Sequence, residues 1–109
     1  MSSNTQERFE NVTVICKANV FFDGKVVSHS ILTPSGKKTI GLIHPGEFRF
    51  TTEASERMEI TSGTCRVRLS DEKKWTLYTP GASFTVPPKS SFEITVEKGI
   101  TEYICSFGV

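Results

Sequence analysis

Residues 46–63 read Gly-Glu-Phe-Arg-Phe-Thr-Thr-Glu-Ala-Ser-Glu-Arg-Met-Glu-Ile-Thr-Ser-Gly, and residues 81–87 read Gly-Ala-Ser-Phe-Thr-Val-Pro. Apolar side chains recur here at every second position, in the pairs Phe48/Phe50, Met58/Ile60 and Phe84/Val86. This alternation is typical of a β-strand with one buried face. Glycines stand at both ends of the first stretch, and tight turns favour glycine because its backbone accepts left-handed conformations. The two stretches therefore predict short strands joined by turns.

The same period continues in both directions along the chain. Strand-like runs occupy residues 12–16, 26–32, 39–43, 48–50, 58–60, 65–69, 75–77, 84–86, 92–96 and 103–107. Turn-forming pairs such as Asp23-Gly24 and Pro80-Gly81 separate them, and no amphipathic helical stretch competes. About ten short strands with frequent turns predict an all-β sandwich or barrel. A chain of 109 residues fits one domain, which we place at residues 11–109, after a flexible N-terminal segment over residues 1–10.

Charge and hydropathy limit the classes of partner. Thirteen basic and twelve acidic side chains leave a net charge of +1, and the basic residues form no stripe. The chain therefore lacks the electrostatic signature of nucleic-acid or membrane-surface binding. It also has no apolar run near the roughly 20 residues that span a membrane, and its first ten residues do not resemble a signal peptide. These features predict a cytoplasmic protein.

The cysteines and histidines do not suggest a metal or redox site. Cys16, Cys65 and Cys105 are far apart in the sequence and lie in apolar surroundings, without the Cys-x-x-Cys spacing of zinc or redox sites. We expect three buried, inert thiols. His29 and His44 are fifteen residues apart and fall in different predicted elements, so the sequence does not support a metal site between them.

Glu56 is the candidate functional carboxylate. If it faces the interior, the period of two places Met58 and Ile60 beside it and turns Arg57 outward. A glutamate on an apolar wall is either a partnered structural acid or a pocket acid that binds hydroxyl groups or moves a proton. The sequence leaves both alternatives open.

The spacing of the glycines, the glutamate and the proline resembles the two-motif pattern of the cupins. The matching positions are Gly46, Glu56-x₆-Gly63 and Gly81-x₅-Pro87. Where that pattern has its metal-binding histidines, this sequence has Phe50 and Thr52, or Arg49 and Thr51 in the longer spacing, and Phe92. A metal centre needs three or four converging ligands, and only Glu56 of that set remains. The resemblance implies a single cupin-type β-barrel or jelly roll whose pocket holds no metal.

A longer ordered set of short motifs makes the resemblance more specific. The motifs are Phe22-x-Gly24-Lys25-Val26-x-Ser28, Gly41, Gly46-Glu47-Phe48-x-Phe50-x-Thr52, Glu56-x-Met58, Ser62-Gly63, Gly81-x-x-Phe84-x-Val86-Pro87 and Tyr103-x-Cys105. Together they resemble the small single-domain pyrimidine/purine nucleoside phosphorylases. The resemblance implies reversible phosphorolysis of a broad range of nucleosides to free base and ribose 1-phosphate, with inorganic phosphate as co-substrate and no other cofactor. It also implies a homodimer, as is common among small cupins.

Phosphorolysis sets chemical demands that the residues can be matched to. The site must hold phosphate, orient the ribose hydroxyls and stabilise the departing base. We expect Glu56 to bind the ribose and to favour the positive charge that develops on it. The candidates for the other contacts are Lys25, Lys37 and Arg49 for phosphate, Thr52 as a hydroxyl donor, and Phe48, Phe50 and Phe92 as an aromatic wall for the base. A one-residue slip around residues 53–55 would exchange the inward set Phe48, Phe50 and Thr52 for Arg49 and Thr51.

The predicted strand over residues 11–19 precedes the point where we expect the family pattern to begin. Its alternation suits an edge strand that pairs within the chain or with a second subunit.

Two other functional classes remain open. A metal-free cupin can be a binding module for a small sugar or nucleoside-like ligand. A metal-dependent cupin enzyme would need ligands that the motif positions lack.

Overall fold

The structure, a computed structural model, describes residues 7–109, and strands dominate them. The strands are β1 (Thr13–Val14), β2 (Asn19–Phe21), β3 (Val26–Thr33), β4 (Gly36–Ile43), β5 (Gly46–Thr51), β6 (Glu56–Ser62), β7 (Cys65–Leu69), β8 (Thr76–Tyr78), β9 (Ser83–Val86), β10 (Ser91–Val96) and β11 (Thr101–Phe107). The one helical element in this part of the chain is a 3₁₀ turn, η1 (Phe22–Gly24). None of its helices is long and apolar enough to cross a membrane.

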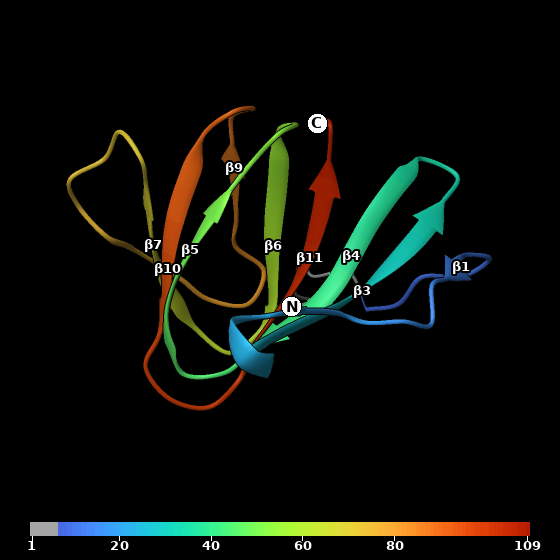
Figure 1. The fold of residues 1–109 in the computed structure, drawn as a ribbon, viewed down its shortest axis with the longest axis horizontal. Coiled ribbons are helices and arrows are strands. Elements are labelled where there is room, and N and C mark those ends of the chain that lie inside the picture. Colours follow the sequence, from blue (N-terminus) through green and yellow to red (C-terminus); the bar gives the residue numbers. More distant parts are fainter. Residues whose placement is uncertain (1–6) are drawn as a thin grey trace.

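The strands form two antiparallel sheets. The larger sheet has the order β1-β3-β4-β11-β6-β9, with β2 also paired to β3, and the smaller has the order β5-β10-β7-β8. Figure 1 shows β5, β10 and β7 on one side of the molecule and β11, β4 and β3 on the other. Side chains from both sheets form a common core that includes Ile60, Val67, Val86 and Ile94, each at most 2% exposed. The predicted all-β, cupin-type fold is confirmed, and nine of the ten predicted strands occur as β3 to β11.

Alternation assigns the faces of the strands that carry the candidate residues. In β6, Met58 and Ile60 are buried while Arg57 is exposed, as the period of two predicts. In β5, Phe48 is buried and Arg49 is exposed, so the phenylalanines of β5 face the interior. Thr51 is the last residue of β5, and Thr52, which follows it, is buried in step with Phe48.

The N-terminal region differs from the prediction. A bend at Cys16 and Lys17 divides the predicted strand over residues 11–19 into β1 and the start of β2, and both strands pair with β3 of the same chain. Cys16 is exposed at this bend, so the expectation of a buried thiol is wrong there, whereas Cys65 and Cys105 are buried. Residues 7–10 belong to no strand or helix, and residues 1–6 of the predicted flexible segment lie outside the described residues.

Gly63 shows why the turns of this fold favour glycine. Its φ is +76°, and a Cβ atom there would lie 2.4 Å from the carbonyl oxygen of Ile100, at the turn before β11. Gly99 has a similar φ of +72°, but a Cβ atom there would have no neighbour within 4 Å. A side chain at either position would carry the conformational cost of a positive φ, but only a side chain at Gly63 would also clash with the backbone.

We expect Gly63→Ala to destabilise the protein more than Gly99→Ala. Both substitutions force a side chain into a left-handed conformation, which costs about 1–2 kcal/mol, and only Gly63→Ala adds a clash with backbone. Urea unfolding of the two variants and the native protein measures the difference. Equal losses for both variants would show that the contact with Ile100 does not matter.

Candidate active site

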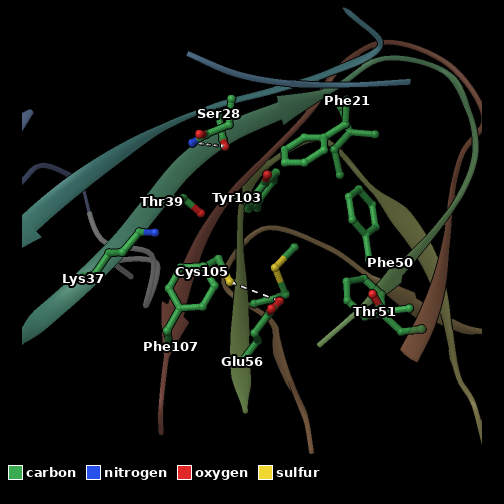
Figure 2. A pocket seen from close by; sticks show the side chains of 14 residues that line it. Phe21, Ser28, Lys37, Thr39, Phe50, Thr51, Glu56, Tyr103, Cys105 and Phe107 are labelled. Atoms are coloured by element: carbon green, nitrogen blue, oxygen red, sulfur yellow. Dashed lines mark hydrogen bonds between the residues drawn. The ribbon is translucent and has the colours of Figure 1, made fainter. Parts of the chain in front are cut away.

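A cavity of about 270 Å³ opens between the two sheets. The larger sheet contributes polar side chains to its wall, among them Ser28, Lys37, Thr39, Glu56 and Tyr103. The smaller sheet contributes Phe50 and Phe92. Figure 2 shows these side chains converging from β3, β4, β6 and β11 on one side and β5 on the other. The cavity lies near the lower end of the roughly 300–1,000 Å³ that small-molecule sites occupy.

Glu56 enters the cavity from the first position of β6. It is paired with Phe107 of β11 and Val86 of β9, and the backbone N–H of Gly108 donates to the carbonyl oxygen of Ser55 at 2.8 Å. These backbone bonds hold the start of β6 in place. The inward alternation of β6 then turns the Glu56 carboxylate toward the cavity.

The Glu56 carboxylate has a thiol as its hydrogen-bond partner. Cys105 Sγ donates to Glu56 Oε1 at 3.6 Å, and no cation among residues 7–109 forms an ion pair with Glu56. Burial raises the pKa of Glu56, and the hydrogen bond from Cys105 partly opposes this shift. Burial, together with the charge and the hydrogen bond of Glu56, raises the pKa of the Cys105 thiol. Cys105 therefore stays protonated and acts as a donor. A carboxylate that lines a cavity and has its pKa raised by burial is a candidate functional group.

Lys37 enters the cavity from β4, next to Phe107. Its Nζ atom is 5.4 Å from the centre of the Phe107 ring, a cation–π distance. Thr39 follows two residues later on the same face of β4 and is buried. Among the described residues that line the cavity, Lys37 is the single cation. This end of the cavity can therefore attract an anion.

Aromatic rings form the opposite wall. Phe50 and Phe92 are stacked, with ring centres 5.5 Å apart and planes inclined by 22°. Phe21 from β2 meets Phe50 edge to face at 6.1 Å and is 44% exposed. These rings offer flat apolar surfaces to a ligand that has an aromatic face.

The other predicted site residues lie outside the cavity lining. Phe48 is buried in the core against Phe22, with ring centres 5.0 Å apart. Thr52 is also buried, and its Oγ1 donates to the Pro87 carbonyl at 2.7 Å and accepts from the Ser90 N–H at 3.0 Å. These bonds join the residue after β5 to the segment between β9 and β10. Lys25 is exposed and ends the η1 turn.

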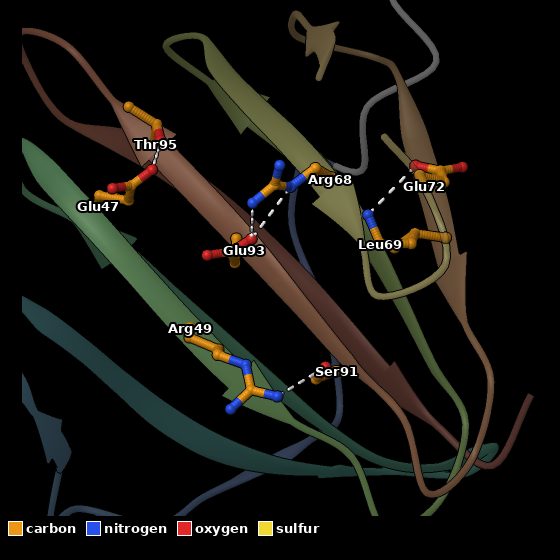
Figure 3. A network of polar contacts seen from close by, with 8 residues as sticks. All are labelled: Glu47, Arg49, Arg68, Leu69, Glu72, Ser91, Glu93 and Thr95. Atoms are coloured by element: carbon orange, nitrogen blue, oxygen red, sulfur yellow. Dashed lines mark hydrogen bonds and ion pairs between the residues drawn. The ribbon is translucent and has the colours of Figure 1, made fainter. Parts of the chain in front are cut away.

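Arg49 belongs to a polar network on the outer face of the smaller sheet. Its Nη2 donates to Ser91 Oγ at 3.4 Å. Figure 3 shows the neighbouring contacts, in which Arg68 Nε donates to Glu93 Oε1 at 3.1 Å and Thr95 contacts Glu47. Because Arg49 alternates with the inward Phe48 and Phe50, its guanidinium points away from the cavity.

Several residues of the cavity had no role assigned by the sequence analysis. Tyr103, Cys105 and Phe107 share the inward face of β11, and the period of two could have grouped them with Glu56. Asn19 and Phe21 come from β2. The sequence analysis predicted one N-terminal strand and therefore did not recognise β2 as a separate element. Among residues 7–109, no group of three or more His, Cys, Asp or Glu side chains is placed to hold a metal ion.

Comparison with known proteins identifies the family. The family model described as "Pyrimidine/purine nucleoside phosphorylase" matches residues 16–107. A protein of that name from Aromatoleum aromaticum is 52% identical over 103 residues, covering 94% of this chain and 96% of the relative. One from Burkholderia ambifaria (strain MC40-6) is 48% identical over 108 residues, covering 98% and 99%. The family model begins at residue 16, within the predicted strand over residues 11–19, and the Burkholderia relative aligns over 108 residues, so the family resemblance extends further toward the N-terminus than expected.

Solved structures support the same grouping. A crystal structure of a protein of unknown function from Acinetobacter sp. ADP1 superposes with a TM-score of 0.88 at 42% identity, covering 92% of this chain and 97% of the other. The family match spans every element that lines the cavity. The fold, the cavity and these relatives agree, and the chain belongs to the pyrimidine/purine nucleoside phosphorylase family.

Proposed function

We propose that this protein cleaves purine and pyrimidine nucleosides with inorganic phosphate, giving free base and ribose 1-phosphate. A phosphate oxygen forms a bond to C1′ of the ribose while the C1′–N bond breaks, and the bonding electrons leave with the base. The observation that carries the proposal is a carboxylate that has no cationic partner within residues 7–109 and lies between a lysine and an aromatic wall in one cavity. The family relatives named for this activity support it.

The Lys37 end of the cavity suits the phosphate. Lys37 supplies the charge, and the Thr39 hydroxyl two residues along β4 supplies a donor. Hydrogen bonds to charged groups contribute about 1.5–3 kcal/mol each.

Glu56 suits the ribose. Its carboxylate accepts hydrogen bonds from sugar hydroxyls, and its negative charge stabilises the positive charge that develops at C1′ as the glycosidic bond opens. Cys105 orients the carboxylate without neutralising it, because a thiol with a raised pKa donates a hydrogen bond and carries no charge.

Phe50 and Phe92 suit the base. Stacking uses the flat face that all nucleobases share, and it is therefore tolerant of base identity. This tolerance supports a broad range of purine and pyrimidine substrates. The reverse reaction would use the same contacts, and the site residues named here need no metal. The homodimer, the domain boundary at residue 11 and the cytoplasmic location stay predictions.

We expect base release from uridine and from adenosine to require inorganic phosphate. In the Glu56→Gln variant kcat/KM should fall by about 100-fold, the loss typical for removal of one transition-state contact. Chromatography of free base and ribose 1-phosphate, with and without phosphate, measures this. Phosphate-dependent release that persists in the variant would show that Glu56 is not a catalytic residue. No release from any nucleoside would favour a binding module for a small sugar or nucleoside-like ligand instead.

Replacing Lys37 tests the phosphate end separately. Lys37→Ala should raise the KM for phosphate by about 10–100-fold, which corresponds to the loss of one charge-assisted contact, with a smaller effect on the KM for uridine. Lys98→Ala, on an exposed turn far from the cavity lining, is the matched control. Equal KM values for phosphate in both variants would show that Lys37 does not bind the phosphate.

The burial of Glu56 predicts a pH-dependent cost in stability. Its pKa is raised in the folded protein, so folding favours the protonated acid, and the contribution of Glu56 to stability falls as pH rises from about 4.5 through the folded pKa. Glu56→Gln removes this dependence. The melting temperature of the variant relative to the native protein should therefore be higher at pH 7 than at pH 4.5, as measured by circular dichroism. A constant difference across this range would contradict the expectation.

A further inference from the structure

Four neighbouring strands place their residues in one row at the end of the cavity away from Lys37. Asn19 of β2 pairs with Ser28 of β3, Ser28 pairs with Gly41 of β4, and Gly41 pairs with Tyr103 of β11. Asn19, Ser28 and Tyr103 all line the cavity. The mechanism proposed above gives none of them a role.

Gly41 allows the side chains of this row to approach one another. A Cβ atom at Gly41 would lie 2.8 Å from Ser28 Cβ and 2.8 Å from the Tyr103 hydroxyl oxygen. The Tyr103 phenol therefore lies over Gly41, in the space that any larger residue would fill. Figure 2 shows Tyr103 between Ser28 and the aromatic side chains Phe21 and Phe50.

The hydrogen-bond pattern of the row leaves the Tyr103 proton available. Asn19 Nδ2, which can only donate, contacts Ser28 Oγ at 3.3 Å and Ser30 Oγ at 3.2 Å. Ser28 Oγ therefore accepts from Asn19, which leaves the Ser28 proton free for the Tyr103 phenol oxygen that lies with Ser28 over Gly41. Tyr103 can then donate its own proton to a ligand.

We propose that Tyr103 donates a hydrogen bond to the base at the acceptor beside its glycosidic nitrogen, which is N3 in a purine and O2 in a pyrimidine. Asn19 and Ser28 act as positioning residues for the phenol. This inference rests on the proposed function and adds the group that stabilises the leaving base.

The position of Tyr103 fits the order of the substrate parts. Lys37 and Gly41 are four residues apart on β4, which corresponds to about 13 Å along the strand. The phosphate end and the Tyr103 end are therefore well separated, and Glu56, which is assigned to the ribose, lies between the aromatic wall and the Lys37 end. A base that stacks on Phe50 turns its edge toward the phenol.

The chemistry explains how one donor can serve many bases. As the C1′–N bond breaks, its electron pair moves into the base ring and spreads onto N3 or O2. A hydrogen bond to that atom stabilises the developing negative charge, and the departed base takes its proton from solvent. N3 of adenine and O2 of thymine are equivalent acceptors on the minor-groove edge, so a single hydroxyl donor can bind either base and does not discriminate between them. Burial raises the pKa of Tyr103 to about 12, and the donor is therefore present at neutral pH.

The test compares Tyr103→Phe with the matched control Tyr78→Phe, because Tyr78 packs on Phe84 outside the cavity lining. Both variants keep the aromatic ring, and circular dichroism checks their folding. We measure kcat/KM with adenosine, uridine and 3-deazaadenosine, which lacks the N3 acceptor. Inhibition constants of free adenine and 3-deazaadenine against uridine provide the same comparison by binding.

We expect Tyr103→Phe to lower kcat/KM about 10–100-fold for adenosine and uridine, mainly through kcat, and Tyr78→Phe to leave it unchanged. With 3-deazaadenosine, or with 3-deazaadenine as inhibitor, Tyr103→Phe should change little, because the acceptor is already missing. Ser28→Ala should show the same pattern with a smaller loss. An equal loss with and without N3, or no loss at all, would overturn the assignment of Tyr103. Absence of phosphate-dependent release by the native protein would instead overturn the proposed function, and this inference with it.

Discussion

The antiparallel pairing of β11 with both β4 and β6 is the constraint on which the site depends. β11 lies between these strands in the larger sheet, and its inward residues are Tyr103, Cys105 and Phe107. The pairing places Tyr103 opposite Gly41, Cys105 opposite Thr39 and Met58, and Phe107 opposite Glu56. A shift of one residue would turn all three side chains of β11 away from the cavity. The register of one strand thus determines which groups can meet a ligand.

The cavity combines two surfaces with different chemistry. The larger sheet supplies groups that donate, accept or carry charge, whereas the smaller sheet supplies the stacked rings of Phe50 and Phe92. A ligand with one flat apolar part and several polar groups satisfies both surfaces at once. The raised pKa of Glu56 reflects the same combination, because the carboxylate is partly buried beside apolar side chains and its hydrogen-bond donor is the thiol of Cys105.

The sequence predicted the strands and the inward face of β6 well, because both depend on alternation within a few residues. It also identified Glu56, Lys37, Phe50 and Phe92, which line the cavity. Thr52 is buried as the alternation predicts, but its hydroxyl bonds to Pro87 and Ser90 instead of lining the cavity, and a local pattern does not show such a partner distant in sequence. Tyr103 had no assigned role because its contact with Ser28 depends on the order of strands distant in sequence, and on the missing side chain of Gly41. Local patterns carry no information about such neighbours.

The order of the strands in the sequence has a consequence for synthesis. β11 occupies residues 101–107 and follows β4 and β6, yet these two strands lie on either side of it within the sheet. On the ribosome, β4 and β6 emerge before the strand that joins them, and each keeps an unpaired edge until β11 is available. The nascent chain is therefore open to edge-to-edge association during this interval. The pocket, which takes Tyr103, Cys105 and Phe107 from β11, is assembled only when this late strand pairs.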